Sequence, residues 1–257
     1  MAASKPLPPT SLLRRSDTHR FIASKHGESV LARIADSSRH LDDIFKLDIA
    51  TNDRTLAENG ISAGIDAREL VFGLPYYRTV NAAFTHPHPL GSRFNGPERG
   101  AWYCGFEIET SIAEISFHKT IDLLEIGVLE DDVTYDDYTA DFSAEFHDLR
   151  ASKRFARYLD PNSYVESQRL AEELLAMGSL GIVYPSVRNA GGTCIACFRP
   201  SLVANVARQS TYRFIWGGTT TPSVSPVTRA EGVSGRRRSA RRGSSPQSQS
   251  IARKSRQ

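Results

Sequence analysis

Apolar residues recur along this chain with two different periods, and the periods predict a mixture of helices and strands. Helical spacing indicates helical structure between Glu28 and Leu47, either one helix or two that divide at Ser37-Ser38. It also indicates a helix between Ser163 and Gly178, with a capping box at Ser163-x-x-Glu166. Short apolar runs predict strands over residues 76–84, 101–106, 123–129, 181–184, 193–198 and 212–216. Since strands and helices do not alternate regularly, we expect an α+β (mixed) domain rather than a doubly wound sheet.

The less periodic segments predict the domain boundaries. Residues 1–20 are rich in proline and serine, so we expect a flexible N-terminal arm. Residues 21–218 are expected to form a single domain. The acid-rich stretch 130–141 is interpreted as a solvated surface loop. Residues 219–257 have few apolar side chains and predict a disordered basic tail.

Composition favours an ordinary globular protein of the cytoplasm. The hydrophobic fraction is 40%, no apolar run has the length of a membrane span, and the three cysteines offer no disulfide framework. The tail contains nine Lys/Arg and one acid, a balance of +8. The net charge of +3 therefore leaves −5 on residues 1–218.

Common catalytic and metal-binding signatures are absent or weak. The chain contains no dinucleotide-binding glycine fingerprint, no P-loop and no Gly-x-Ser-x-Gly motif. His86-x-His88 lacks a third ligand at a recognisable spacing, so we predict no metal site. Cys194-x-x-Cys197 has no second pair, and residues three apart on a strand point to opposite faces. Two buried structural cysteines are the favoured interpretation.

The stretch from Arg93 to Glu114 combines a cation, a phenol and a carboxylate in one loop, strand and helix start. Arg93 stands beside a turn, Tyr103 in the strand 101–106, and Glu114 in a helix that begins at Thr110 or Ser111. Loops and strand ends commonly present functional groups. Each residue also has a structural explanation: Ser111-x-x-Glu114 fits a capping box, Tyr103 an ordinary strand aromatic, and Arg93 a solvated side chain.

A set of short motifs resembles the RES-domain family. They are Gly91-Ser92-Arg93-Phe94-Asn95, Gly100-Ala101-Trp102-Tyr103, Thr110-Ser111-Ile112-Ala113-Glu114 with His118, and Pro185-Ser186. The resemblance covers about residues 66–205. The family is named for an arginine, a glutamate and a serine, which correspond here to Arg93, Glu114 and Ser186. Known members are toxins of bacterial toxin–antitoxin pairs that consume NAD, with an ADP-ribosyltransferase-like fold of small packed β-sheets and surrounding helices.

The resemblance implies roles for six residues. Glu114 would stabilise the ribosyl cation that forms when nicotinamide leaves, Arg93 would bind the pyrophosphate, and Tyr103 would pack on nicotinamide or ribose. Ser186 would hydrogen-bond a phosphate. Arg78 and Asn95 are further expected substrate-binding residues.

The resemblance also implies the reaction and its partners. NAD is a substrate rather than a cofactor, and inorganic phosphate is the expected co-substrate, which makes the protein an NAD phosphorylase. Protein ADP-ribosyl transfer and hydrolysis stay open as alternatives. The expected protein partner is a separately encoded helix-turn-helix antitoxin.

A hypothesis of another class assigns the function to the tail. The run Arg236-Arg237-Arg238 with Arg241-Arg242 is typical of segments that contact nucleic acid or an acidic partner. Because residues 1–218 are acidic, they offer no second basic surface for such binding.

Overall fold

The computed structural model describes residues 6–27 and 64–228. The chain divides into two units, Met1–Val227 and Thr228–Gln257, and all helices and strands below belong to the first. The predicted helix between Glu28 and Leu47 and most of the predicted basic tail lie outside the described residues.

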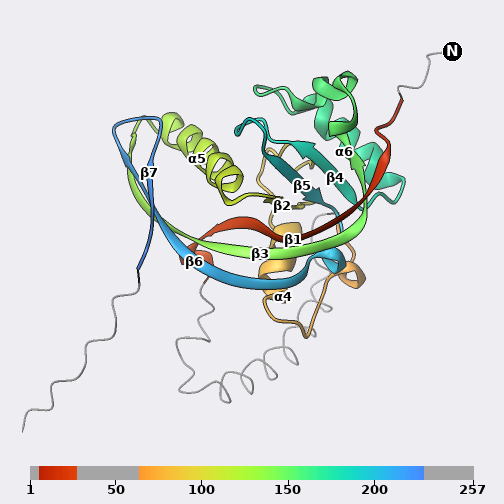
Figure 1. The fold of residues 1–257 in the computed structure, drawn as a ribbon, viewed down its shortest axis with the longest axis horizontal. Coiled ribbons are helices and arrows are strands. Elements are labelled where there is room, and N and C mark those ends of the chain that lie inside the picture. Colours follow the sequence, from red (N-terminus) through yellow and green to blue (C-terminus); the bar gives the residue numbers. More distant parts are fainter. Residues whose placement is uncertain (1–5, 28–63, 229–257) are drawn as a thin grey trace, which may run out of the picture. The chain divides into compact units, whose positions relative to one another are not determined.

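Seven strands of the described residues form one sheet in the order β1-β2-β5-β4-β3-β6-β7. Their bounds are β1 Thr10–Ala23, β2 Trp102–Gly105, β3 Glu130–Asp148, β4 Gly181–Pro185, β5 Thr193–Cys197, β6 Ala204–Gly217 and β7 Ser223–Pro226. β1, β3 and β6 are long, curved and run side by side (Figure 1). β1 pairs with both β2 and β3, which closes β1, β2, β5, β4 and β3 into a ring.

The described helices pack around this sheet. They are α1 Ser24–Gly27, α4 Tyr77–Thr85, α5 Ile108–Glu125 and α6 Val165–Ala176, with 3-10 turns at Ala67–Glu69, Leu149–Ala151, Lys153–Leu159 and Pro200–Leu202. None of the described helices is both long and apolar enough to cross a membrane. The expected mixed fold is confirmed, although the strands join in one sheet rather than in several small ones.

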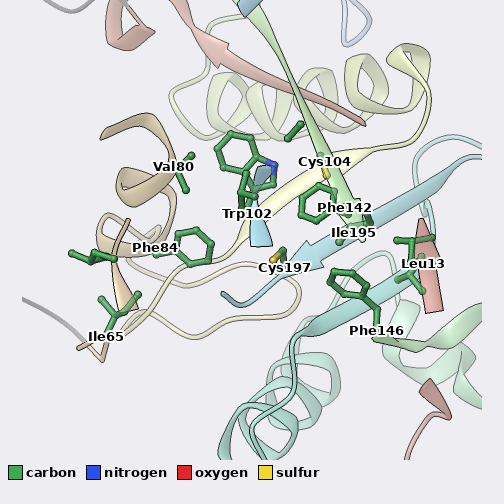
Figure 2. Close-up of a cluster of buried hydrophobic side chains, with 14 residues drawn as sticks. Leu13, Ile65, Val80, Phe84, Trp102, Cys104, Phe142, Phe146, Ile195 and Cys197 are labelled. Atoms are coloured by element: carbon green, nitrogen blue, oxygen red, sulfur yellow. The ribbon is translucent and has the colours of Figure 1, made fainter. Parts of the chain in front are cut away.

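Strand register separates two faces of β2, β4 and β5. Trp102 and Cys104 on β2 lie opposite Cys197 and Ile195 on β5. These side chains share a buried cluster with Val80 and Phe84 of α4 and with Phe142 and Phe146 of β3 (Figure 2). The alternate residues Tyr103, Tyr184 and Cys194 lie on the other face, in a cluster that includes Leu170 and Leu174 of α6. The predicted split of Cys194 from Cys197 is therefore confirmed.

The predicted flexible arm is wrong, because residues 10–20 belong to β1. β1 pairs with β3 from Thr10↔His147 to Ala23↔Tyr135. A register shift follows Arg15, next to Asp17, whose φ of 54° is left-handed. The segment has few apolar residues; Leu13 and Phe21 are buried in hydrophobic clusters, and the rest of the strand is held mainly by pairing with β3. One buried example is the hydroxyl of Thr18, which donates to Ala140 O at 2.7 Å.

The predicted surface loop at 130–141 is also wrong, since it forms most of β3. A period of two runs through Tyr138, Ala140, Phe142 and Phe146, all of them buried. The dense carboxylates of this strand obscure the pattern. Two of these carboxylates have partners inside the protein: Asp136 forms an ion pair with Arg208 at 2.8 Å, and Asp137 lies 2.9 Å from Nδ1 of His19.

Two predicted strands are helical. Residues 76–84 form α4, whose buried positions Tyr77, Val80, Asn81 and Phe84 follow helical spacing. Residues 123–125 are the last turn of α5, and Gly127, at φ 72°, follows that helix. The strands predicted at 101–106, 181–184, 193–198 and 212–216 are confirmed as β2, β4, β5 and part of β6.

The predicted tail begins too early. Residues Ser223–Pro226 form β7, which pairs with β6 from Tyr212↔Pro226 to Ile215↔Ser223. At α6, the glycine Gly178 follows the helix as predicted, with φ 81°. The capping box predicted there is wrong, because the residue that caps α6 is Tyr164 and it makes no side-chain cap.

Candidate functional site

Glu114 lies in the second turn of α5 and does not cap the helix. α5 begins at Ile108 after Glu107, so Ser111 is already inside it. The Ser111 hydroxyl donates to His19 O at 2.6 Å and accepts from Gly105 N at 3.1 Å. These bonds fasten α5 to β1 and β2. The capping-box interpretation is therefore wrong, and the Glu114 carboxylate is available for another role.

The Glu114 carboxylate contacts neutral groups only. The Ser186 hydroxyl donates to Oε1 at 2.7 Å, and the Cys194 thiol lies 3.8 Å from the same oxygen. Within residues 6–27 and 64–228, the second oxygen, Oε2, has no hydrogen-bond partner. A carboxylate oriented through one oxygen leaves its other oxygen free to accept from a ligand.

Ser186 follows β4 and has its hydrogen-bonding capacity filled. Besides donating to Glu114, its Oγ accepts from Arg188 N at 3.1 Å and from Asn189 N at 3.0 Å. One donor and two acceptor positions are all that a hydroxyl has. Ser186 thus links the turn after β4 to the carboxylate on α5, and we assign it the orientation of Glu114 rather than direct phosphate binding.

The turn after β4 is fixed to the start of α5 at a second point. Asn189 Nδ2 donates to Thr110 Oγ1 at 2.9 Å. Gly192 closes the turn so tightly that a Cβ atom there would stand 2.3 Å from Thr110 Oγ1. This position needs glycine because the helix leaves no room for a side chain.

Tyr103 organises the loop that precedes its strand. Its hydroxyl accepts from Phe94 N and donates to Asn95 Oδ1, both at 2.8 Å. Asn95 Nδ2 in turn donates to Gly96 O at 2.7 Å. Burial raises the pKa of Tyr103 above its ordinary value, so the hydroxyl stays protonated. Tyr103 and Asn95 therefore serve to shape the loop that presents Arg93.

Arg93 is buried, with 7% of its surface exposed, and forms no ion pair with any described residue. Its Nη1 donates to Asp160 O at 2.7 Å, and its guanidinium lies 4.7 Å from the centre of the Tyr164 ring. The loop turns sharply at Gly91, where a Cβ would stand 2.3 Å from Asn95 O. A buried cation without a carboxylate partner is unusual, because burial of an unpaired charge costs free energy.

Electrostatics indicate that the predicted residues share one neighbourhood. Burial and the charge of Glu114 raise the pKa of Tyr184, whereas the charge of Arg93 lowers it. Loss of solvent around the imidazole lowers the pKa of His118, and the positive charges of Arg188 and Arg93 lower it further. The negative charge of Glu114 raises this pKa. Glu114 and Arg93 thus act on both side chains, and Arg188 acts on His118.

Arg78 stands apart from this group. It lies on α4, where its Nε donates to the Tyr77 hydroxyl at 3.3 Å, and burial lowers its pKa. α4 packs on the face of β2 that carries Trp102, opposite the face that carries Tyr103. Substrate binding by Arg78 stays a prediction.

A pocket of about 500 Å³ adjoins the site along α5. Ala113, Phe117 and Thr120 form its helical wall, Arg188 stands at its edge, and residues 220–222 of the β6–β7 connection lie across it. Among the described residues, no group of three or more His, Cys, Asp or Glu is placed to hold a metal ion.

A family model for the RES domain matches residues 70–217, more than half of the chain. The chain belongs to the RES family. This family generally acts on NAD. The match begins after β1, so β1 completes the sheet from outside the matched residues.

Two further comparisons add little to this assignment. The crystal structure of the M. tuberculosis MbcT–MbcA toxin–antitoxin complex matches with 11% identity and a TM-score of 0.41, over 78% of this chain and 85% of the other. No curated protein matches the chain.

Several residues near Glu114 and Arg93 belong to none of the sequence motifs. Asp160 and Tyr164, which contact Arg93, lie before and at the start of the helix predicted from Ser163. Arg188 lies between the strands predicted at 181–184 and 193–198 and was not singled out, although it neighbours both the site and the pocket. Its position two residues after Ser186 is the sequence feature that could have pointed to it.

Proposed function

We propose that this RES protein cleaves the bond between nicotinamide and ribose in NAD, with Glu114 as the catalytic carboxylate. The observation that supports this most is the state of Glu114: it does not cap α5, it forms no ion pair with any described residue, and one of its oxygens is oriented by Ser186. A carboxylate kept in this way suits stabilisation of a cation that develops only in the transition state.

The proposed chemistry needs few groups. Nicotinamide leaves as a neutral base when the C1–N bond breaks, and positive charge spreads over the ribose ring, as in glycoside cleavage. The negative charge of Glu114 opposes that developing charge, and its free oxygen is suited to accept a hydrogen bond from the 2′-hydroxyl. Arg93 is suited to the diphosphate because a guanidinium presents paired donors to phosphate oxygens.

The acceptor we propose is inorganic phosphate. A phosphate oxygen forms the new bond to C1, so that NAD and phosphate give nicotinamide and ADP-ribose 1″-phosphate. Water would give ADP-ribose instead, and a protein side chain would give an ADP-ribosylated protein. We further propose that a separately encoded antitoxin binds this protein and blocks access to Glu114.

Product analysis tests the proposal. We expect the antitoxin-free protein to release nicotinamide, faster with phosphate present, with a phosphorylated ADP-ribose detected by ³¹P NMR. Release of nicotinamide with ADP-ribose as the only product, at a rate independent of phosphate, would assign hydrolysis instead. A folded protein that releases no nicotinamide under either condition would disprove the proposed reaction.

A further inference from the structure

Two arginines that come from different parts of the fold meet at consecutive backbone carbonyls. Arg93, in the loop before β2, donates to Asp160 O at 2.7 Å. Arg188, in the turn after β4, donates to Pro161 O at 2.6 Å. Since neighbouring residues are about 3.8 Å apart along the chain, the two guanidiniums converge on one short segment.

Both arginines are held by neutral groups. Arg93 lies over the Tyr164 ring at 4.7 Å, and Arg188 lies over the Phe117 ring at 3.3 Å. Within residues 6–27 and 64–228, neither forms an ion pair, and each uses one of its nitrogens in a hydrogen bond. A guanidinium carries five N–H donors. Most donors of both side chains therefore have no hydrogen-bond acceptor among the described residues.

The charges of this pair act together. Arg188 and Arg93 both lower the pKa of His118, which stands one helical turn after Glu114. Two positive charges next to each other repel, and nothing in the described residues neutralises them. An anion with several oxygens would relieve this repulsion and could accept hydrogen bonds from both forks at once. A diphosphate has that charge and that number of acceptors.

The pocket beside Arg188 runs along α5. Arg188 and Phe117 form part of its wall, whereas Glu114 does not line it. Its volume of about 500 Å³ falls in the range of small-molecule sites. If the nicotinamide riboside faces Glu114, the diphosphate lies next along the dinucleotide, and the adenosine lies beyond the diphosphate.

We propose that Arg188 and Arg93 together bind the diphosphate of a dinucleotide, and that the pocket lined by Ala113, Phe117 and Thr120 receives its adenosine. The orientation of the ligand rests on the proposed function; the anion site itself rests on the two arginines. Neither Arg188 nor this pocket belongs to the residues that the sequence motifs single out.

Binding of ADP to the full chain tests this proposal without requiring catalysis. ADP contains the adenosine and the diphosphate but no bond that the enzyme would cleave. By calorimetry we expect Arg188→Gln to weaken ADP binding at least about 10-fold, the scale of a lost charge-assisted hydrogen bond. Arg188→Lys, which keeps the charge and loses the fork, should fall between wild type and Arg188→Gln.

Arg15 provides a matched control. Its guanidinium also lies over a phenylalanine ring, that of Phe106 at 4.9 Å, and donates to a backbone carbonyl, Phe106 O, at 2.9 Å. Arg15→Gln therefore removes the same two kinds of contact at a different place. We expect its ADP affinity to stay within about 2-fold of wild type, because it touches neither the pair nor the pocket.

The pocket is tested by filling it. Ala113→Phe adds a ring to the helical wall, and we expect it to weaken ADP binding at least about 10-fold while inorganic diphosphate binds as to wild type. Equal loss for both ligands would overturn the adenosine assignment. ADP affinity that is absent in wild type, or unchanged in Arg188→Gln, would overturn the anion site.

Nicotinamide release measured on the same samples separates the two proposals. Arg188-dependent ADP binding without any nicotinamide release would refute the proposed reaction and keep the anion site. Nicotinamide release without Arg188-dependent ADP binding would keep the reaction and refute the anion site.

Discussion

Two carboxylates of this protein show how differently one fold treats the same chemical group. Glu69 accepts from Arg99 through both oxygens at 2.8 Å and from Arg199 at 2.6 Å, and these bonds lower its pKa to about 2. Glu114 accepts from a serine hydroxyl, with a thiol nearby. The negative charge of Glu69 is neutralised by two arginines, whereas Glu114 forms no ion pair with any described residue.

The arginines follow the same division. Arg99 and Arg199 form ion pairs with Glu69. Arg93 and Arg188 instead donate hydrogen bonds to the backbone carbonyls of Asp160 and Pro161. An ion pair within the protein stabilises the fold, and its two charges interact only weakly with a ligand. Separated charges cost stability, and a protein retains them where a substrate supplies the missing partner. This contrast supports the proposal that the Glu114 region binds the substrate.

The largest effect is expected from Glu114→Gln. The amide keeps the shape and can still accept from Ser186, but it removes the negative charge. We expect nicotinamide release to fall at least about 100-fold, as for loss of one electrostatic contact in a transition state. The free energy of unfolding, measured in urea, should stay within about 0.5 kcal/mol of wild type, because no charged partner is lost. A large loss of stability would instead place Glu114 among the structural carboxylates.

Arg93→Gln should lower kcat/KM for NAD about 10- to 100-fold, mostly through KM, because the arginine is assigned to binding of the diphosphate. Steady-state kinetics give the two constants separately. Arg154→Gln is the control, since Arg154 is exposed and its guanidinium lies over the Phe155 ring at 4.7 Å. A change in kcat alone would argue against a binding role for Arg93.

Ser186→Ala tests whether this residue orients Glu114 or binds phosphate. Without the hydroxyl, Glu114 loses its hydrogen bond, and the amides of Arg188 and Asn189 lose their acceptor. We expect kcat to fall about 10-fold, on the scale of one hydrogen bond, with an unchanged KM for phosphate. A KM for phosphate that rises while kcat is maintained would restore the phosphate-binding role predicted from the sequence.

Glu69→Gln should have the smallest effect on activity and a measurable one on stability. Loss of bonds to two arginines should lower the free energy of unfolding by about 1–3 kcal/mol, with kcat within about 2-fold of wild type. The pKa of Glu69 lies near 2, below its ordinary 4.5, so its stabilisation is present above pH 4.5 and is lost as pH falls toward 2. Urea unfolding of both proteins across this range should show their difference shrinking.

The sequence predicted which candidate residues lie together better than it predicted the strands around them. Short motifs single out Arg93, Tyr103, Glu114 and Ser186, and the structure brings them into one region, while their roles stay predictions. Residues 10–23 and 130–148 were missed because the pairing of β1 with β3 hides their polar side chains in ion pairs and bonds between strands. Local patterns cannot reveal a partner about 120 residues away.

The roles of the site residues could be predicted only in part. Whether Glu114 caps its helix depends on where α5 begins, and that depends on the bonds of Ser111 to His19 and Gly105. The position of Arg188 is fixed by Pro161 and Phe117, which are distant from it in sequence. Both depend on long-range contacts that motifs do not encode.

The central claim is that Glu114, and not merely a carboxylate of this fold, drives loss of nicotinamide. It is tested most directly by measuring nicotinamide release per folded molecule for wild type, Glu114→Gln and Glu69→Gln in one phosphate-containing assay. We expect Glu69→Gln to match wild type within about 2-fold and Glu114→Gln to be at least about 100-fold slower. Folded Glu114→Gln protein with wild-type turnover would contradict the account.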